Sequence, residues 1–229
     1  MAVGFRIYTK VKRADKKLVE SFKGIPVAAI SDNMGRIACL DTGISPYCVP
    51  TILGVAITVK VAPNDNLMFH KAIDMALPGD VIVVDGEGSM AHSLCGEIMY
   101  SYAKSRGIAG FVVDGCIRDI DSLNKIQFSV YARGVQPKGP YKNGPGEINV
   151  PVSVGGLVVC PGDIVYGDMD GVVIIKEADA PALIELANKH VQNEEAIFAD
   201  IKAGVLNRDW VDKTISANGG VVVDDYFAC

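Results

Sequence analysis

The sequence predicts an α/β fold with a layered core, and two patterns carry this prediction. Between residues 53 and 113, apolar strand-like segments alternate with segments of helical spacing, in the order strand, helix, strand, helix, strand. Glycines border the apolar segments, as in GDVIVVDGEG and GIAGFVVDG, where they are typical of turns in a strand-rich core. Hydrophobic residues make up 49% of the 229 residues, which is enough to fill such a core. Ligands of α/β folds bind at the carboxyl ends of strands, so residues that follow strands are the first candidates for a site.

The individual elements follow from periodicity and capping residues. Asp65 is the expected N-cap of one helix, Pro78 follows the end of that helix, and Gly107 closes the next one. Before them lie a short helix, a short apolar segment and an irregular stretch that runs to Pro50. The predicted elements are a helix over 15–22, an apolar segment over 27–30, a strand over 53–61, a helix over 65–76, a strand over 81–84, a helix over 94–105 and a strand over 111–113.

The second half of the chain is richer in strands. Short β segments separated by Gly, Pro and Asn run over 128–175, without a change of composition that would mark a linker. We expect this half to pack on the α/β half as a second sheet layer. A long helix follows over 180–202, opened by Asp179 and Pro181 and closed by Gly204.

The predicted organisation is one domain over residues 1–204, which includes the long helix, and a tail over 205–229. The tail contains Trp210 and the run VVVDDYF. Because exposed apolar strands tend to associate, we expect the tail to pack on its own subunit or on a neighbouring one.

Charge and cysteine usage narrow the classes of function. Lys and Arg total 22 against 27 Asp and Glu, a net charge of −5 that argues against binding nucleic acid or an anionic membrane through bulk charge. No apolar run reaches the ~18 residues of a membrane span, and the N-terminal residues do not resemble a secretory leader. The six cysteines are dispersed without a CxxC pair, which favours free thiols over a zinc site or disulfides. We therefore expect a cytoplasmic protein that acts on a small molecule or binds another protein.

The segment VVDGCIRDID is the most informative part of the chain. It leaves a very apolar strand, turns at Gly115 and then places Arg118, Asp119 and Asp121 where α/β folds hold their active sites. The Asp119 carboxylate could bind a divalent cation, and the planar Arg118 guanidinium could bind a substrate carboxylate. The alternative is structural: Asp119 would cap the short helix that follows, with Arg118 as its ion-pair partner.

The segment AHSLCGEIM is a second candidate. Gly96, Glu97, Ile98 and Met99 lie in the opening turn of a predicted helix, where backbone N–H groups lack helical partners and can bind an anion. In the alternative interpretation this is an ordinary helix start whose Glu97 complements the helix dipole. One helix and one strand separate Gly96 from Arg118, a unit that returns the chain to the same edge of the sheet.

Glu194 is the third candidate because its position breaks a pattern. On the long helix it falls in the middle of an apolar stripe, whereas Glu195 lies well off that stripe. A charge on an apolar face is costly unless it is paired or serves a site. Glu194 is therefore expected either to form an ion pair at a subunit contact or to reach a metal or substrate.

The three histidines, His70, His92 and His190, are scattered and do not have the spacing of metal ligands. We interpret them as structural or surface residues, with His92 a distant candidate for a site. The chain also contains no Walker A motif, no GxSxG and no GxGxxG between a strand and a helix.

Two stretches resemble a known family: GEIMYSYAKSRGIAGFVVDGCIRDIDSL and GPGEINVPVSVGGLVVCPGDIVYGDMDGVVII. Over residues 25–204 the chain is similar to the 4-hydroxy-4-methyl-2-oxoglutarate and 4-carboxy-4-hydroxy-2-oxoadipate aldolases. That family shares its fold with the RraA regulators of ribonuclease E. The resemblance implies an RraA-like swivelling β/β/α domain with a C-terminal helix and tail, assembled as a trimer or hexamer with the site at the subunit interface.

The resemblance also implies roles for particular residues. The loop of Gly96, Glu97, Ile98 and Met99 matches the backbone amides that hold the substrate, and Arg118 matches the substrate-binding arginine. Asp119 matches the ligand of Mg²⁺ or Mn²⁺, and Glu194 matches an acidic residue supplied across the subunit interface. One position departs from the family pattern: an acid is expected three residues after Asp119, and this chain has Ser122 there.

These roles describe a class II pyruvate aldolase that also decarboxylates oxaloacetate. A divalent metal ion stabilises the pyruvate enolate left when the C3–C4 bond of a small 2-oxo acid breaks. Arg118 would bind the substrate carboxylate, and Glu97 and Glu194 would orient the waters that move the C4 hydroxyl proton. Two alternatives remain open, an RraA-like regulator that binds ribonuclease E or a helicase, and a structural oligomer whose site has lost its activity. The known RraA-like regulators are shorter and lack the long terminal helix, which favours the aldolase over the regulator. The structural oligomer stays open because Ser122 replaces the acid of the family pattern.

Overall fold

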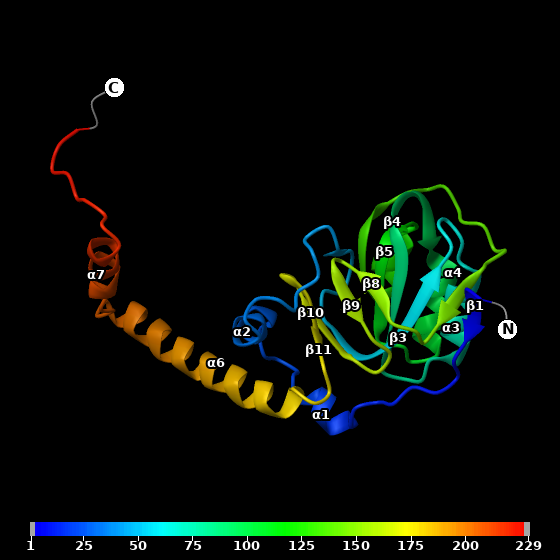
Figure 1. Ribbon diagram of the computed structural model, residues 1–229, viewed down its shortest axis with the longest axis horizontal. Helices are drawn as coiled ribbons and strands as arrows, with labels where there is room; N and C mark the ends of the chain where they lie inside the picture. Colours follow the sequence, from blue (N-terminus) through cyan, green and yellow to red (C-terminus); the bar gives the residue numbers. More distant parts are fainter. Residues whose placement is uncertain (1–2, 227–229) are drawn as a thin grey trace. The chain divides into compact units, whose positions relative to one another are not determined.

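The computed structural model describes residues 3–226 and confirms the α/β class. Four parallel strands form the centre of a large sheet, and each is joined to the next by a helix on the same face (Figure 1). This is the predicted alternation of strand and helix, continued by one further helix and strand. In chain order the elements are β3 (Ile52–Val61), α3 (Leu67–Met75), β4 (Asp80–Cys95), α4 (Glu97–Ser105), β5 (Gly110–Ile117), α5 (Ile120–Ile126) and β6 (Ser129–Val135).

Shorter strands extend this sheet to nine strands, in the order β1-β7-β3-β4-β5-β6-β2, with β10 also paired to β3 and β11 to β10. The remaining two strands form a separate antiparallel hairpin of β8 and β9. Most of the predicted β-rich half therefore joins the main sheet. The strands that extend the sheet are β1 (Phe5–Ile7), β2 (Ser45–Pro46), β7 (Gly146–Ile148), β10 (Ile164–Asp168) and β11 (Gly171–Ile175), and those of the hairpin are β8 (Val152–Val154) and β9 (Leu157–Val159).

Two apolar clusters fill the two faces of the sheet, because alternate residues of each central strand point to opposite sides. In β4, Ile82 and Val84 pack with the helices, against residues such as Phe69 of α3. Val81 and Val83 pack on the other face, with residues of the β8–β9 hairpin and of β10 and β11. The near-continuous apolar run of β4 is thus the mark of a strand covered on both faces.

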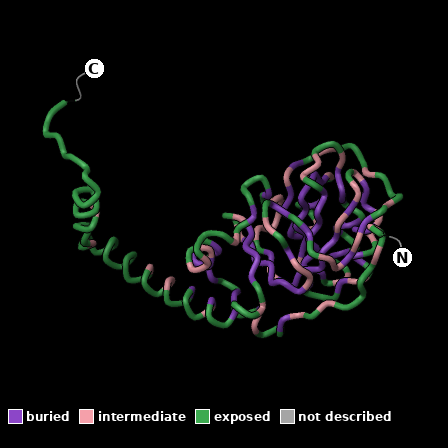
Figure 2. Tube along the Cα trace, viewed as in Figure 1, coloured by how far each residue is buried: buried purple, intermediate pink, exposed green. Residues whose placement is uncertain are grey.

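The chain divides into two units, residues 1–188 and residues 189–229. The helix α6 (Ala180–Ala203) buries Ala180, Leu183 and Ala187, which all belong to the first unit. The second unit contains the rest of α6 and α7 (Asp209–Ala217), which has no buried residue (Figure 2). Most of the large apolar side chains there are exposed, namely those of Ile197, Phe198, Ile201, Val205, Trp210, Ile215, Val221, Val222, Val223 and Tyr226.

Two expected element boundaries were wrong, and one segment that was expected only to be apolar is a helix. The apolar segment over 27–30 is the first part of α2 (Val27–Asn33), because Asp168 of β10 accepts a hydrogen bond from the Val27 N–H at 3.0 Å. That cap comes from far along the chain, so no local pattern indicates it. The strand over 81–84 continues to Cys95, and the next helix starts at Glu97 rather than at residue 94. The pairing of β4 with β5 contains bulges between Asp85 and Cys95, so β4 continues through a polar segment. A polar segment does not have the apolar pattern of a buried strand, and the sequence analysis therefore ended the strand too early.

Other expectations agree with the structure. The helix α1 (Lys16–Glu20) lies within the predicted range, and Asp15 caps it by accepting from the Lys17 N–H at 2.8 Å. Five cysteines are free thiols, and Cys229 lies outside the described residues. Within residues 3–226, no helix is both long and apolar enough to cross a membrane.

Candidate functional site

The carboxyl ends of β4 and β5 bring two of the predicted segments together. Cys95, the last residue of β4, pairs with Ile117, the last residue of β5. Gly96 follows the first strand and Arg118 follows the second, and the Arg118 N–H donates to the Cys95 carbonyl at 3.1 Å. Parallel pairing therefore places the start of α4 beside the Arg118–Asp119 turn, as the sequence predicts.

Direct contacts join the two segments. The Glu97 N–H donates to Asp119 Oδ2 at 2.9 Å, and Arg118 Nε lies 3.6 Å from the same oxygen. A Cβ on Gly96 would overlap Asp119 Oδ2 and lie 3.0 Å from Arg118 Nε. Gly96 has φ −161°, which any residue can adopt, so space rather than conformation requires glycine here. The close approach aims the Asp119 carboxylate at the start of α4.

The structure contains only one of the two features of the structural alternative for Asp119, the ion pair and not the helix cap. Asp119 occupies the N-cap position of α5, but its side chain makes no capping hydrogen bond to that helix. Its backbone has φ 62° and ψ 44°, a left-handed conformation that is uncommon for a residue with a side chain. The Arg118 ion pair of that alternative is present. Strained residues of this kind concentrate at functional sites, where the surrounding structure holds them in place.

A buried tyrosine fixes the backbone behind the site. The Tyr100 hydroxyl of α4 donates to the Arg118 carbonyl at 2.8 Å, and the Cys95 thiol lies 3.8 Å from the same hydroxyl. Burial raises the pKa of Tyr100 strongly and raises the pKa of Cys95 to about 12. Both groups therefore stay protonated at neutral pH, which makes them supports of the site rather than a base or a nucleophile.

A cavity of about 250 Å³ opens at this junction. The four predicted loop residues line it together with Arg118 and Asp119 of the turn, whereas Asp121 does not; residues from the start of α3 and from the segment over 138–143 complete the lining. The lining residues are Asn66, His70, Cys95, Gly96, Glu97, Ile98, Met99, Arg118, Asp119, Pro140 and Lys142. The cavity thus combines a guanidinium, a carboxylate and a helix start.

Only some of the predicted amides are available to a ligand. The Glu97 N–H is taken by Asp119, and the Met99 N–H donates to the Gly96 carbonyl at 3.0 Å. Among the described residues, none accepts a hydrogen bond from the Ile98 N–H. The anion-binding capacity of the helix start therefore rests chiefly on Ile98 and on the adjacent Arg118.

The sequence analysis missed one wall of the cavity. Asn66 and His70 come from the first turn of α3 and the residue before it, which follow the carboxyl end of β3, and Lys142 comes from the loop after β6. His70, which the sequence analysis interpreted as a structural or surface residue, lies at the cavity wall. Burial and the nearby Lys142 charge lower the pKa of His70. The i,i+4 spacing of Asn66 and His70 after a parallel strand was the signal that could have found them.

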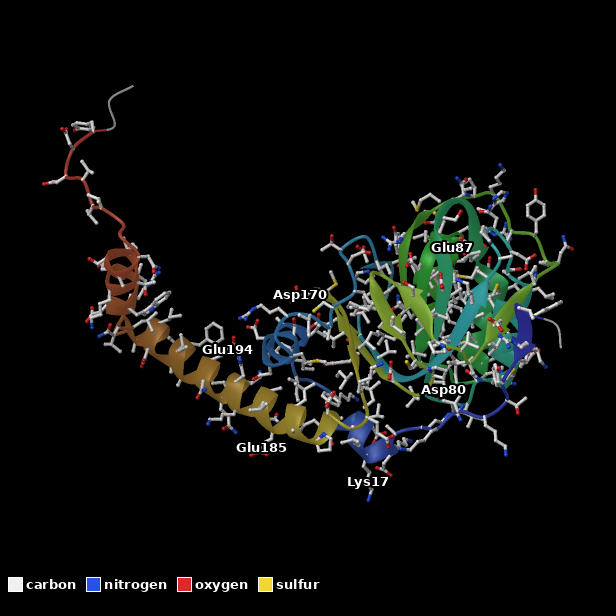
Figure 3. The ribbon with its side chains drawn as sticks, in the orientation of Figure 1. Lys17, Asp80, Glu87, Asp170, Glu185 and Glu194 are labelled. Carbon is white, nitrogen blue, oxygen red and sulfur yellow. The ribbon has the colours of Figure 1, made fainter. Side chains whose placement is uncertain are left out.

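Glu194 lies on the part of α6 that belongs to the second unit (Figure 3). Its side chain is 44% exposed, and its Oε1 lies 3.4 Å from Nε2 of His190, one helical turn earlier. Glu195 is exposed, as its position off the stripe predicts. A role for Glu194 at the cavity stays a prediction.

Asp119 is the residue whose free oxygen fits a metal ion. Among the described residues, none donates a hydrogen bond to its Oδ1, and the side chain is 39% exposed. The residues over 3–226 contain no cluster of three or more His, Cys, Asp or Glu with metal-binding geometry. Proteins commonly hold Mg²⁺ through one or two carboxylates together with oxygens of the substrate and several waters, and one free carboxylate oxygen is compatible with that arrangement.

Comparisons with known proteins agree with this fold. The model of the RraA-like family, described as Aldolase/RraA, matches residues 27–174. A protein of Halalkalibacterium halodurans named "Putative 4-hydroxy-4-methyl-2-oxoglutarate aldolase" is 37% identical over 207 residues, which are 90% of this chain and 99% of that protein.

Two solved structures are similar in fold. A crystal structure of an uncharacterized protein from Pseudomonas syringae has a TM-score of 0.75 at 26% identity, covering 84% of this chain and 96% of that one. Streptomyces coelicolor RraAS2, described as an unusual member of the RNase ES inhibitor RraA family, has a TM-score of 0.74 at 28% identity, covering 81% of this chain and 98% of that one. From the family match and the extent of these similarities, the chain belongs to the RraA-like, Aldolase/RraA family.

Proposed function

We propose that the protein is a class II pyruvate aldolase that uses a divalent cation, Mg²⁺ or Mn²⁺. Its substrates would be 4-hydroxy-4-methyl-2-oxoglutarate or 4-carboxy-4-hydroxy-2-oxoadipate, and it would also decarboxylate oxaloacetate. The observation that carries this proposal is the meeting of Arg118, Asp119 and the free Ile98 N–H at one cavity. The name of the Halalkalibacterium halodurans relative supports the same substrate class.

The substrate carboxylate would bind to Arg118. A guanidinium offers two parallel N–H donors to a carboxylate, and the Ile98 N–H at the positive end of α4 adds a third donor. The hydrogen bond from Tyr100 to the Arg118 carbonyl holds the backbone from which the guanidinium extends. These donors would form an anion site for the 2-oxo acid end of the substrate.

Asp119 would hold the cation through Oδ1 while Oδ2 stays hydrogen-bonded to the Glu97 N–H. When bound, the cation supplies Lewis-acid stabilisation of the negative charge that develops on the 2-oxo oxygen. Glu97, whose side chain is exposed at the mouth of the cavity, would orient a water that accepts the C4 hydroxyl proton. Loss of CO₂ from oxaloacetate leaves the same enolate, so one site would serve both reactions.

We further propose that Glu194 acts at the cavity of a neighbouring subunit in a trimer or hexamer. The exposed apolar residues that follow it, such as Phe198, Ile201 and Trp210, support a subunit contact there. Size-exclusion chromatography with light scattering tests the assembly. A monomer at micromolar concentration would contradict this part of the proposal.

The decisive experiment measures pyruvate release from oxaloacetate and from 4-hydroxy-4-methyl-2-oxoglutarate with Mg²⁺, before and after EDTA. We expect turnover only with metal, none from Asp119→Ala and a near-complete loss from Arg118→Ala. Asp121→Ala is the matched control, because it removes a neighbouring carboxylate that does not line the cavity. Normal turnover by Asp119→Ala would contradict the proposal.

The similarity to RraAS2 favours one alternative, a regulator that binds ribonuclease E. Immobilised ribonuclease E tests it in the same preparation. Absence of turnover on both substrates together with tight ribonuclease binding would reverse the order of the two proposals. Absence of both would favour a structural oligomer, the interpretation that Ser122 keeps open.

A further inference from the structure

One wall of the cavity carries an unsatisfied hydrogen-bond acceptor. Asn66 is only 3% exposed, lines the cavity and has no partner for its Oδ1 among the described residues. Leaving a buried polar atom unpaired is unfavourable, so such atoms in native proteins call for a ligand, a water or a strain that explains them. The position of Asn66 in the cavity wall points to a ligand.

The neighbours of Asn66 determine which atom meets the ligand. Its Nδ2 donates to the Leu94 carbonyl at 2.8 Å, and a carbonyl can only accept. Exchanging the amide oxygen and nitrogen would set two acceptors against each other, so Oδ1 is the atom left without a partner. The Asn66 N–H also donates to the Tyr141 carbonyl at 3.0 Å, which fixes the backbone. The cavity therefore presents an acceptor that requires a donor from the ligand.

The positively charged side chain of Lys142 lines the same cavity. Lys142 belongs to a loop that three hydrogen bonds hold in place. The Ser93 N–H donates to the Lys138 carbonyl, and the Tyr141 N–H donates to the Asn64 carbonyl. The Asn143 N–H donates to Asp65 Oδ2. Among the described residues, Lys142 has no ion-pair partner, in contrast to Arg118, which lies beside Asp119. Its positive charge is therefore available to an anion in the cavity.

We propose that Asn66 and Lys142 form a second subsite, which recognises the C4 end of the aldol substrate. Asn66 Oδ1 accepts the hydrogen of the C4 hydroxyl, and Lys142 pairs with the carboxylate attached to C4. The inference rests on the proposed aldolase function, because Arg118 is assigned there to the 2-oxo acid end. It goes beyond that function by naming the two side chains that would distinguish the groups on C4.

Three substrates separate the two contacts. 4-Hydroxy-4-methyl-2-oxoglutarate carries both groups on C4, 4-hydroxy-2-oxopentanoate carries only the hydroxyl, and oxaloacetate carries neither, because its C4 is itself the carboxylate carbon that leaves as CO₂. A merely structural defect would lower turnover of all three in proportion. Ratios of kcat/KM measured on one preparation therefore report the contacts and not the stability of the variant.

For Asn66→Ala we expect kcat/KM for 4-hydroxy-4-methyl-2-oxoglutarate to fall about tenfold relative to oxaloacetate, the effect of one lost hydrogen bond. The matched control is Asn149→Gly. Asn149 also donates through Nδ2 to a backbone carbonyl and has an unpartnered Oδ1, but it lies outside the cavity. Glycine suits its φ of 59°. The control should leave the ratio unchanged, and an unchanged ratio in Asn66→Ala would overturn the role of Asn66.

For Lys142→Met we expect KM for 4-hydroxy-4-methyl-2-oxoglutarate to rise about tenfold, with little change for 4-hydroxy-2-oxopentanoate. Lys138→Met is the matched control, because Lys138 is exposed on the same loop but does not line the cavity. An equal rise for both substrates would overturn the role of Lys142.

One measurement needs no variant and covers the case in which Asn66→Ala fails to fold. With the wild-type enzyme, 2-oxoglutarate and 4-hydroxy-2-oxoglutarate compete against oxaloacetate, and we expect the hydroxylated compound to compete about tenfold more strongly. Equal competition would overturn the subsite while leaving the aldolase proposal intact. A wild-type protein that turns over neither oxaloacetate nor 4-hydroxy-4-methyl-2-oxoglutarate would overturn both.

Discussion

Replacing Gly96 with alanine is a sensitive test of the site, because the added methyl group falls between the side chains that define it. The new Cβ would overlap Asp119 Oδ2 and lie 3.0 Å from both Cγ and Nε of Arg118. Restoring ordinary van der Waals separation requires the Asp119 carboxylate to move by roughly 1 Å. That movement breaks the hydrogen bond from the Glu97 N–H to Asp119 Oδ2.

The magnitude follows from this displacement. A misplacement of about 1 Å in catalytic geometry can lower turnover about 100-fold, so we expect that loss in kcat/KM for both proposed substrates. The fold should survive, because alanine can adopt φ −161° and the displaced side chains are partly exposed. Loss of glycine at the helix N-cap should lower the free energy of unfolding by only about 1 kcal/mol.

Initial rates of pyruvate release and urea unfolding of the same preparation measure the two effects. Gly43→Ala is the matched control, because its Cβ would meet a different ion pair, 2.5 Å from Arg133 Nη1 and 2.8 Å from Asp41 Oδ1, away from the cavity. Gly43→Ala should keep wild-type rates. Wild-type rates in Gly96→Ala would refute the assignment of Arg118 and Asp119 to the reaction.

Three further predictions concern the scaffold. Phe111 is fully buried, and its ring centroid lies 4.8 Å from that of Phe69. Phe111→Ala should lower the free energy of unfolding by about 3–5 kcal/mol. A loss below about 1 kcal/mol in urea unfolding would contradict this packing. Burial raises the pKa of Cys95 to about 12, whereas Cys39 is exposed. Iodoacetamide at pH 8 should therefore label Cys39 and leave Cys95 unmodified, as measured by mass spectrometry. Equal labelling of the two thiols would contradict the burial of Cys95. Burial lowers the pKa of His70 below 6.5, so its contribution to stability is complete above about pH 6.5 and is lost as pH falls through the folded pKa. His70→Gln should therefore weaken the acid dependence of unfolding, and an unchanged dependence would refute the role of burial.

Much of the site could be predicted because it depends on local pattern and one rule of topology. The apolar runs before Gly96 and Arg118 indicate two strands, and a helix between parallel strands returns the chain to the same edge of the sheet. Adjacent carboxyl ends then follow, and the structure has them at the paired residues Cys95 and Ile117. The mismatch of Glu194 with its apolar stripe is likewise readable from helical spacing alone.

The tertiary structure decided the rest. Asn66, His70 and Lys142 share a cavity wall because backbone hydrogen bonds join the loop after β6 to the residues before α3. The side-chain cap that starts α2 and the bulges that lengthen β4 are also contacts between distant parts of the chain. Periodicity records which face of an element is buried, so the sequence by itself determined the α/β alternation and the half of the site at the strand ends. Contacts between distant loops leave no periodic trace, and for that reason only the folded chain shows which side chains line the cavity together with Arg118.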